Sequence, residues 1–536
     1  MPSRIFVGMR KPLTIVLLLL GAGLLLCLLA YPFGYDQAVF AVAGELSIKH
    51  GAVTYRDFLD TKPPFIFTIY GVAIWLFGHH EWAPRLFDAI VQALTLVYFY
   101  RVLLRSTKDT AVAFGSVLLY IVLYVTSGFW MTGQAETFAL LPIVWILSLS
   151  EQARNGAHAL SKGILVGCAS AILFLLKFTL LVVPAGAVLY LVLYSDDRTY
   201  RNSIRFAFGA VASLGILLGV VIGYMSWAGA LRPFFETLAW LSGYAGIDPV
   251  LGAHTIGELY FRQFPIAVVT ALLPTTLVLA FVGIFRNRRS ETKPATIYSH
   301  LLIQLGFGLF SVLYERKFFP YHFSRVYFAF VPFVILGTRS AWELKTEYLS
   351  SLRNLRGIQR TLRQTAVIGI AAIAVFYSPL VRVVTNPLYW AQLRLKGGDV
   401  GAAADSKFGG LYYADQERAA SELKSALRPN ETIFLWGNNV GLYFRTEVEP
   451  RTICLTNTPL VTSWTPQTWK DTLLRQLQTA PPRFFVCETN DARPYITGDT
   501  LDSRQHLEQW SELASFVHTN YHDWKTVGHF VIYEHQ

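Results

Sequence analysis

The chain has 536 residues, of which 53% are hydrophobic, 15% aromatic and only 15% charged. The hydrophobic residues gather in long runs, which excludes an ordinary soluble protein and predicts a polytopic membrane protein. A formal net charge of +11 would suggest a nucleic-acid partner in a soluble chain. Here the Lys and Arg residues cluster between the apolar runs, as cytoplasmic loops require, so we expect no nucleic acid.

The apolar runs predict about eleven transmembrane helices, at roughly 20 residues for each crossing. The candidate spans are residues 12–30, 85–104, 110–128, 137–152, 162–177, 178–194, 206–227, 264–285, 296–313, 323–339 and 365–385. We expect the first span to be retained as a signal anchor. The run 339–363 predicts an amphipathic helix on the cytoplasmic side.

One further apolar run, residues 64–78, is short for a span, and its status decides the orientation of all later segments. If Met1 is cytoplasmic and this run does not span, every later basic cluster falls on the cytoplasmic side. If the run spans, all these clusters fall outside, against the positive-inside rule. We therefore predict an interfacial or re-entrant helix, which places loop 31–84 and the C-terminal region on the non-cytoplasmic face.

The polar C-terminal region predicts a soluble α/β domain over residues 386–536, after a transmembrane module over residues 1–385. We expect strands at 432–437, 451–456, 483–488 and 529–534, and helices at 415–428, 466–479 and 503–517. Cys454 and Cys487 fall in two of these strands. We expect them to be buried thiols, with a disulfide as the alternative.

Loop 31–84 carries three carboxylates, Asp36, Asp57 and Asp60, together with Lys62. Asp36 is placed to cap a helix that Gly51 would end, and the two prolines after Lys62 suit the first turn of the next helix. Lys62 would then lie at the positive end of a helix dipole, which favours a bound anion. Asp36 is therefore either a helix cap alone or an exposed general base.

The other candidate residues fall in later segments of the same non-cytoplasmic side. Glu136 is either the boundary carboxylate of a helix or the second acidic residue of a site. Lys177 joins two apolar runs and is either functional or extended toward the interface. The segment after residue 313 is rich in basic and aromatic residues, which suits either a rim that binds lipid headgroups or a clamp that binds a phosphate. Its cationic candidates are Arg316, Lys317, His322 and Arg325.

Glu81 and Arg85 predict a structural ion pair at the start of a helix. His79 and His80 lie beside Glu81, but their spacing matches no metal-binding motif, so we predict no metal site there. We expect no organic cofactor, and the sequence leaves a divalent cation open.

The motifs of the first loop resemble those of the GT-C membrane glycosyltransferases, a group that includes protein O-mannosyltransferases and lipid A aminoarabinose transferases. The matching positions are Tyr55, Asp57, Asp60, Lys62, Pro63 and Pro64, then Gly78, Glu81 and Arg85, and finally Glu136. Many relatives carry Asp-Glu where this chain has Asp36 and Gln37. This departure puts in doubt any role, including metal binding, that needs two adjacent carboxylates.

The resemblance implies a bacterial inner-membrane enzyme, with its N-terminus in the cytoplasm, that moves a sugar from a polyprenyl-phosphate donor to a lipid, polysaccharide or protein acceptor. It implies that Asp36 is the catalytic carboxylate, that Lys62 contacts the donor phosphate, and that Glu136 is the acidic residue of the second external loop. A transporter or flippase of lipid-linked saccharides is the alternative, and it would carry ionisable residues inside its spans.

Overall fold

The computed structural model describes residues 11–154, 158–194, 200–246, 256–288, 296–352, 365, 369 and 378–536. The chain divides into two compact units, and each is built from three stretches of sequence. Unit 1 takes Met1–Tyr31, Leu86–Leu217 and Leu259–Gln392, whereas unit 2 takes Pro32–Arg85, Leu218–Glu258 and Leu393–Gln536. The predicted first external loop therefore belongs to the same unit as the C-terminal region.

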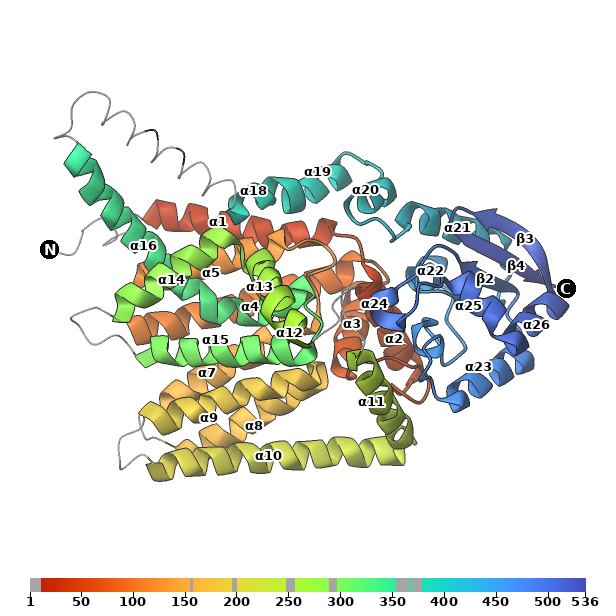
Figure 1. Cartoon of the computed structure of the whole chain (residues 1–536), viewed down its shortest axis with the longest axis horizontal. Coiled ribbons are helices and arrows are strands. Elements are labelled where there is room, and N and C mark those ends of the chain that lie inside the picture. The colour runs from red at the N-terminus through yellow and green to blue at the C-terminus, as the bar shows by residue number, and fades with distance from the viewer. Residues whose placement is uncertain are drawn as a thin grey trace. The chain divides into compact units, whose positions relative to one another are not determined.

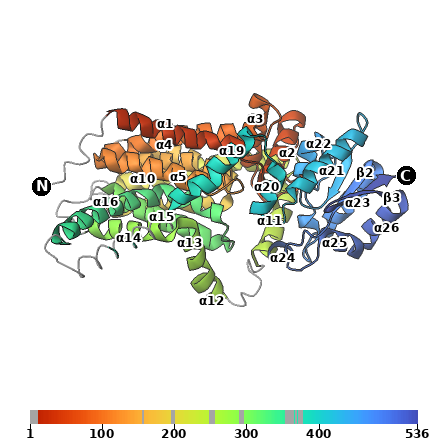
Figure 2. The same cartoon turned by 90° about the horizontal axis from the view of Figure 1, so that it is seen from above.

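Unit 1 is helical over its described residues, and its long helices run roughly parallel to one another in both views (Figure 1 and Figure 2). Its elements are α1 (Lys11–Leu26), η1 (Cys27–Ala30), α4 (Trp82–Thr107), α5 (Thr110–Thr126), α6 (Ala135–Phe138), α7 (Leu140–Arg154), α8 (Ala159–Leu176), η2 (Phe178–Val182), α9 (Val183–Tyr194), α10 (Tyr200–Trp227), η3 (Leu259–Gln263), α13 (Phe264–Leu272), α14 (Pro274–Arg288), α15 (Thr296–Glu315), η4 (Pro320–Val326), α16 (Tyr327–Leu352), α18 (Pro379–Val383), η5 (Val384–Leu388) and α19 (Tyr389–Leu395). Of these, α4 up to Arg85, α10 from Leu218 and α19 from Leu393 belong to unit 2. Within the unit, α14 packs on α16, α7 on α8 and α9, and α9 on α15.

Helices occupy each predicted span from 12–30 to 323–339. By length and hydropathy four described helices could cross a membrane alone, or up to six spans if each of two bent pairs counts as one. The four are Trp82–Thr107, Ala159–Leu176, Tyr200–Trp227 and Thr296–Glu315. The predicted total of about eleven stays a prediction, because the shorter apolar helices miss this length criterion and most of 365–385 lies outside the described residues.

Two predictions for unit 1 are wrong in detail. The predicted span 264–285 is two helices, α13 and α14, bent by 92°. The bend falls at Leu273, whose φ of +66° breaks the helix before Pro274, and a residue before proline is sterically disfavoured in the helical region. The predicted separate helix at 339–363 is instead, as far as Leu352, a continuation of α16. The rest of that run lies outside the described residues.

Unit 2 combines helices with a small sheet (Figure 1). Its elements are α2 (Tyr35–His50), α3 (Phe65–Phe77), α11 (Leu231–Gly246), α12 (Ile256–Glu258), α20 (Val400–Lys407), α21 (Tyr413–Ala426), β1 (Ile433–Trp436), α22 (Gly441–Thr446), η6 (Thr458–Leu460), α23 (Gln467–Thr479), β2 (Phe484–Glu488), α24 (Pro494–Thr497), α25 (Ser503–Gln509), α26 (Ser511–Asn520), β3 (Tyr521–Val527) and β4 (Phe530–His535). The strand order is β1-β2-β4-β3, with β1 and β2 parallel and the other pairs antiparallel.

The structure confirms three of the predicted strands, which become β1, β2 and β4. The predicted strand 451–456 is wrong: Cys454 forms only an isolated bridge with Leu59. Strand β3 has no counterpart among the predicted strands, because its central residues are polar and mostly exposed, without the apolar alternation of a half-buried strand. The predicted helix 503–517 is two helices that meet at Trp510.

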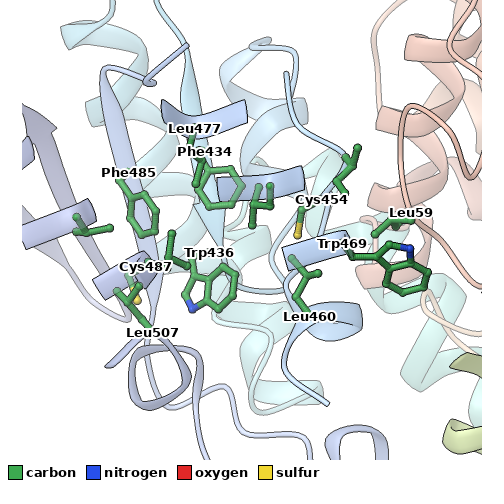
Figure 3. Packing of buried hydrophobic residues seen from close by; sticks show 14 of the residues in the cluster. Leu59, Phe434, Trp436, Cys454, Leu460, Trp469, Leu477, Phe485, Cys487 and Leu507 are labelled. Atoms are coloured by element: carbon green, nitrogen blue, oxygen red, sulfur yellow. The ribbon is translucent and has the colours of Figure 1, made fainter. Parts of the chain in front are cut away.

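The core of unit 2 joins the sheet, α23, α25 and α26 with a residue of the first loop (Figure 3). Trp436, Phe434 and Phe485 lie at its centre, and Leu59 lies at its edge near Trp469. The backbone N–H of Leu59 donates to the carbonyl of Ile453 at 2.7 Å. Both cysteines of this core, Cys454 and Cys487, are buried free thiols, as predicted. A folded C-terminal core thus includes part of the first loop.

Candidate active site

Helix α2 presents Asp36 from inside its first turn. The N-cap is Gly34, so the prediction that Asp36 caps the helix is wrong. The side-chain oxygen of buried Gln37 accepts a hydrogen bond from the backbone N–H of Gly34 at 3.0 Å, which closes the helix start without Asp36. Gly51 ends the helix with a φ of +65°, as predicted. The carboxylate of Asp36 is therefore not used as the cap.

Lys62 meets Asp36 across the first loop. Its ammonium donates to the Asp36 carboxylate at 2.9 Å and lies 4.9 Å from the ring centroid of Phe40. The two side chains are 26% and 23% exposed, respectively, so each retains a face toward solvent. Asp36 belongs to α2 and Lys62 lies just before α3, so the packing of these two helices sets the geometry of the pair.

Close contact between two glycines holds α2 against α3. A Cβ added to Gly44 would lie 2.5 Å from the backbone nitrogen of Gly71, and one added to Gly71 would lie 2.3 Å from the carbonyl oxygen of Gly44. No other residue fits at such an approach of two backbones. These two positions therefore fix how near the helix carrying Asp36 comes to the helix that follows Lys62.

The supporting residues of the loop shape the turn around Lys62. The backbone N–H of Lys62 donates to Asp60 at 2.8 Å, and the Tyr55 hydroxyl donates to the Lys62 carbonyl at 3.0 Å. Burial raises the pKa of Asp60, and the nearby Asp36 carboxylate adds to this rise, against the opposing effect of Lys62. Asp57 instead accepts from Val53 N–H at 2.7 Å and pairs with Arg56, so it stabilises an adjacent turn.

Glu81 and Arg85 have partners other than those predicted. Glu81 accepts from Arg445 at 2.8 Å, from Arg394 at 3.3 Å and from the Tyr413 hydroxyl at 2.7 Å. Arg85 is buried and donates to the carbonyl of Pro32 at 2.7 Å. The Glu81 carboxylate therefore joins the first loop to the C-terminal region of unit 2.

His79 makes a second polar connection within unit 2. Its two ring nitrogens lie 2.8 Å from the Glu45 carboxylate and 2.8 Å from the Phe444 carbonyl, and its ring stacks on Phe444 at 3.9 Å. Burial opposes the charged form, but the hydrogen bonds to these two acceptors outweigh it and raise the pKa of His79. Because both nitrogens face acceptors, the imidazolium form satisfies both contacts.

A buried polar cluster in unit 1 brings together four of the predicted residues. Arg325 donates to Glu136 at 2.9 Å and to Glu315 at 2.7 Å. Lys177 pairs with the same two carboxylates, at 2.8 Å to Glu315. His322 lies 3.0 Å from Glu315 and also contacts the Lys317 carbonyl. We call Glu136, Lys177, Glu315, His322 and Arg325 the unit 1 cluster.

Charge and exposure distinguish the members of this cluster. The two carboxylates balance Lys177 and Arg325, so with neutral His322 the cluster carries no net charge. The side chain of Lys177 is 22% exposed, whereas Glu136 is 1% and Arg325 0% exposed. Lys177 is thus the cation that solvent reaches. Lys317 is buried, and Arg316 stands in a left-handed conformation with φ +57°.

Sequence reasoning missed Glu315, which completes this cluster. The residue ends α15 directly before Arg316, at the position where an apolar span meets a polar segment. Glu136, Glu315 and His322 offer ligand atoms within 4.8 Å of one another, a spacing that could hold a metal ion. Lys177 and Arg325 already compensate both carboxylates, so a divalent cation would face two like charges. The donor set therefore fits an ion-pair network better than a metal centre.

Comparisons with known proteins identify a matching family model and structures of similar fold. Residues 61–223 match the family model described as dolichyl-phosphate-mannose-protein mannosyltransferase, a range that includes Lys62, Glu81, Glu136 and Lys177. No curated protein sequence matches the chain. A crystal structure of ArnT from Cupriavidus metallidurans bound to undecaprenyl phosphate is similar to it over 98% of both chains, with a TM-score of 0.59 and 13% identity.

The apo structure of the same ArnT is similar over 97% of both chains, with a TM-score of 0.57 and 14% identity. The archaeal oligosaccharyltransferase AglB from Archaeoglobus fulgidus, in complex with an inhibitory peptide and a dolichol-phosphate, is similar over 98% of this chain and 74% of its own, with a TM-score of 0.48 and 12% identity. The two ArnT structures confirm the predicted fold class. The chain therefore has the fold of these ArnT structures, with many helices and a small C-terminal sheet.

Proposed function

We propose that this chain is a membrane glycosyltransferase that moves a sugar from a polyprenyl-phosphate donor to an acceptor hydroxyl or amine. The match to a mannosyltransferase family model and the GT-C fold support this class. The observation that carries the proposal is the pairing of Asp36 with Lys62, both partly exposed, in the first loop. The Asp36 carboxylate can accept a proton, and the Lys62 ammonium can bind an anion.

The reaction requires a base and a cation rather than a strong acid. Asp36 accepts the proton of the acceptor O–H or N–H while the freed electron pair attacks the anomeric carbon of the sugar. The bond between that carbon and the phosphate oxygen breaks, and its electron pair leaves with the polyprenyl phosphate. Lys62 stabilises the negative charge that develops on the departing phosphate. One in-line displacement inverts the anomeric centre.

The unit 1 cluster supports a second role, in binding donor phosphate. Lys177 is the accessible cation of that cluster, and its ammonium also lies 5.7 Å from the ring centroid of Tyr321. Arg325 and His322 are buried, so we assign them a positioning role. They orient the carboxylates of Glu136 and Glu315 around Lys177. Glu136 pairs with two cations, which favours a positioning role for it over proton transfer. Arg316 and Lys317 stay candidates for phosphate contact.

The similarity in fold to a structure with a bound lipid phosphate supports the donor class. The similar ArnT structure binds undecaprenyl phosphate, and a lipid-borne donor is consistent with the apolar spans of this chain. We propose that the protein lies in a bacterial inner membrane with its N-terminus in the cytoplasm and unit 2 on the opposite side. The distribution of basic residues between the apolar runs supports this orientation.

Product analysis with purified protein in lipid nanodiscs tests this function. The protein is incubated with undecaprenyl-phosphate-linked sugars and with lipid, polysaccharide or peptide acceptors, and the products are analysed by mass spectrometry. We expect glycosylated acceptor and free undecaprenyl phosphate in equal amounts. Release of free sugar alone would indicate a hydrolase. Movement of intact donor between leaflets of a vesicle, without any product, would indicate the rival transporter or flippase.

A further inference from the structure

The C-terminal region of unit 2 holds the first turn of α2, the turn that carries Asp36. The hydroxyl of Tyr35, the neighbour of Asp36, donates to the carbonyl of Gly410 at 2.9 Å. The guanidinium of Arg493 lies 3.8 Å from the centroid of the Tyr35 ring. A cation placed over the face of an aromatic ring is attracted by the negative charge density of that face. Two residues from the C-terminal region therefore fix one side chain at the start of α2.

Neighbouring contacts restrain the same turn. The ring of Phe33 packs edge-on against Phe444 of α22, at 5.2 Å between centroids. Gly34, Tyr35 and Ala38 line a small cavity together with side chains of the C-terminal region, including Leu411, Tyr413, Asn439 and Phe444. Residues on both sides of Asp36 in the chain thus contact α21, α22 and the segments beside them. Asp36 itself faces Lys62.

Two acidic residues, at the end of β2 and just after it, lie in the neighbourhood of Arg493. Glu488, at the end of β2, and Asp491 lie near enough to act on the charge of Arg493. Glu488 is in turn fixed by the backbone N–H groups of Asn438 and Asn439, at 2.7 Å and 3.1 Å, which follow β1. The carboxyl group of Glu488 therefore links the ends of β1 and β2.

We propose that Arg493 and Tyr35 are positioning residues, through which the C-terminal region sets the orientation of the Asp36 carboxylate. This inference rests on the proposed function, because it gives the C-terminal region a part in the transfer reaction. Neither residue takes part in the chemistry. Their contacts keep the first turn of α2 in the geometry that directs Asp36 toward Lys62, so that the base is already in place when donor and acceptor bind.

Steady-state kinetics of the full-length protein test this inference. Arg493→Ala should lower kcat roughly tenfold to a hundredfold, while KM for the donor changes less than about threefold. Tyr35→Ala should have a similar effect, and the double variant should lose little more than either alone, because both changes remove the same contact. Tyr35→Phe keeps the ring under Arg493 and should retain most of the activity.

The matched control is Arg483→Ala. Arg483 also lies over an aromatic ring, that of Phe484 at 4.9 Å, and it pairs with Glu431 and Glu534 within the C-terminal region, away from α2. We expect kcat within about twofold of the wild type for this variant. An equal fall of kcat in Arg483→Ala and Arg493→Ala would overturn the positioning role, because it would reflect a general weakening of the region.

A second readout separates this inference from the function itself. Hydrogen exchange of the backbone amides in the first turns of α2 should quicken in Arg493→Ala and stay unchanged in Arg483→Ala and Asp36→Asn. This measurement does not depend on transfer activity. Wild-type protein without any transfer would refute the proposed function, whereas unchanged exchange in Arg493→Ala would refute the positioning role alone.

Discussion

The carboxylate of Glu81 lies 2.8 Å from the guanidinium of Arg445, although 364 positions separate them in the chain. Both side chains are 18% exposed, and Arg445 also lies over the ring of Tyr413 at 4.3 Å. Glu81 belongs to the loop between two apolar helices, and Arg445 belongs to α22. This pair is one of several contacts by which unit 2 unites the first loop with the C-terminal region.

Removal of one partner from this pair should destabilise unit 2. Glu81→Gln leaves Arg445 without its main compensating charge, and we expect a loss of about 2 kcal/mol, the range for hydrogen bonds between charged groups. Thermal unfolding in detergent, followed by tryptophan fluorescence, measures the change. Glu449→Gln is the control, since Glu449 pairs with His50 at a site where both side chains are half exposed. Its effect should stay below about 1 kcal/mol.

His79 should make the stability of unit 2 depend on pH. Hydrogen bonds to Glu45 and Phe444 raise the pKa of His79 above its ordinary value of 6.5, despite the opposing effect of burial. The folded protein therefore binds the proton more tightly than the unfolded chain. The stabilisation is complete below about pH 6.5 and is lost as pH rises through the folded pKa.

The Tm of the wild type and of His79→Gln between pH 5.5 and pH 9 tests this dependence. The wild type should lose more stability than the variant as the pH rises across this range. Parallel curves would show that the imidazolium contributes nothing to folding.

Glu315 should be essential to the unit 1 cluster. Glu315→Gln leaves one carboxylate against two cations, of which Arg325 is fully buried, and we expect a cost of about 3 kcal/mol or more. The double variant Glu315→Gln with Lys177→Met restores the charge balance and should recover part of this loss. Glu343→Gln in α16, where the side chain is 34% exposed, is the control and should cost less than about 1 kcal/mol. Equal effects at Glu315 and Glu343 would contradict a compensated buried network.

Gly44→Ala should separate α2 from α3. The added methyl would lie 2.5 Å from backbone atoms of α3, so the helices must move apart at a cost of about 1–3 kcal/mol. Because this packing sets the distance between Asp36 and Lys62, transfer activity should also fall. Gly306→Ala in α15 is the matched control, since nothing lies within 4 Å of its added Cβ. That change should be neutral or stabilising by up to about 1 kcal/mol.

The helical membrane module could be predicted because its signals are local. Apolar runs gave the positions of the helices, and Gly51 predicted the end of α2 correctly. Hydropathy could not predict the bend at Leu273 or the uninterrupted course of α16. It averages over a window of residues and carries no information on the backbone conformation of a single residue. Strand β3 was missed for a related reason, since its polar residues carry no strand periodicity.

The candidate site could be predicted in part. Asp36 and Lys62 both fall in loop 31–84, so the sequence alone predicted that they belong to one site, and the structure pairs them. Glu315 and the partners of Glu81 depend on packing between segments far apart in the chain, and a single sequence holds no signal for such contacts. The predicted Asp36 cap was wrong for a local reason, because the side chain of Gln37 closes the helix start instead.

Transfer by Asp36→Asn protein tests the central claim most directly. Purified wild-type and variant proteins in nanodiscs are compared for binding of undecaprenyl-phosphate-linked sugar and for formation of glycosylated acceptor, with Asp471→Asn on the exposed face of α23 as the control. The wild type and Asp471→Asn should form product. Asp36→Asn should bind donor with similar affinity but fall in rate by a factor of about 100 or more, since it has lost its base. Product formation by Asp36→Asn at the wild-type rate would contradict the assignment.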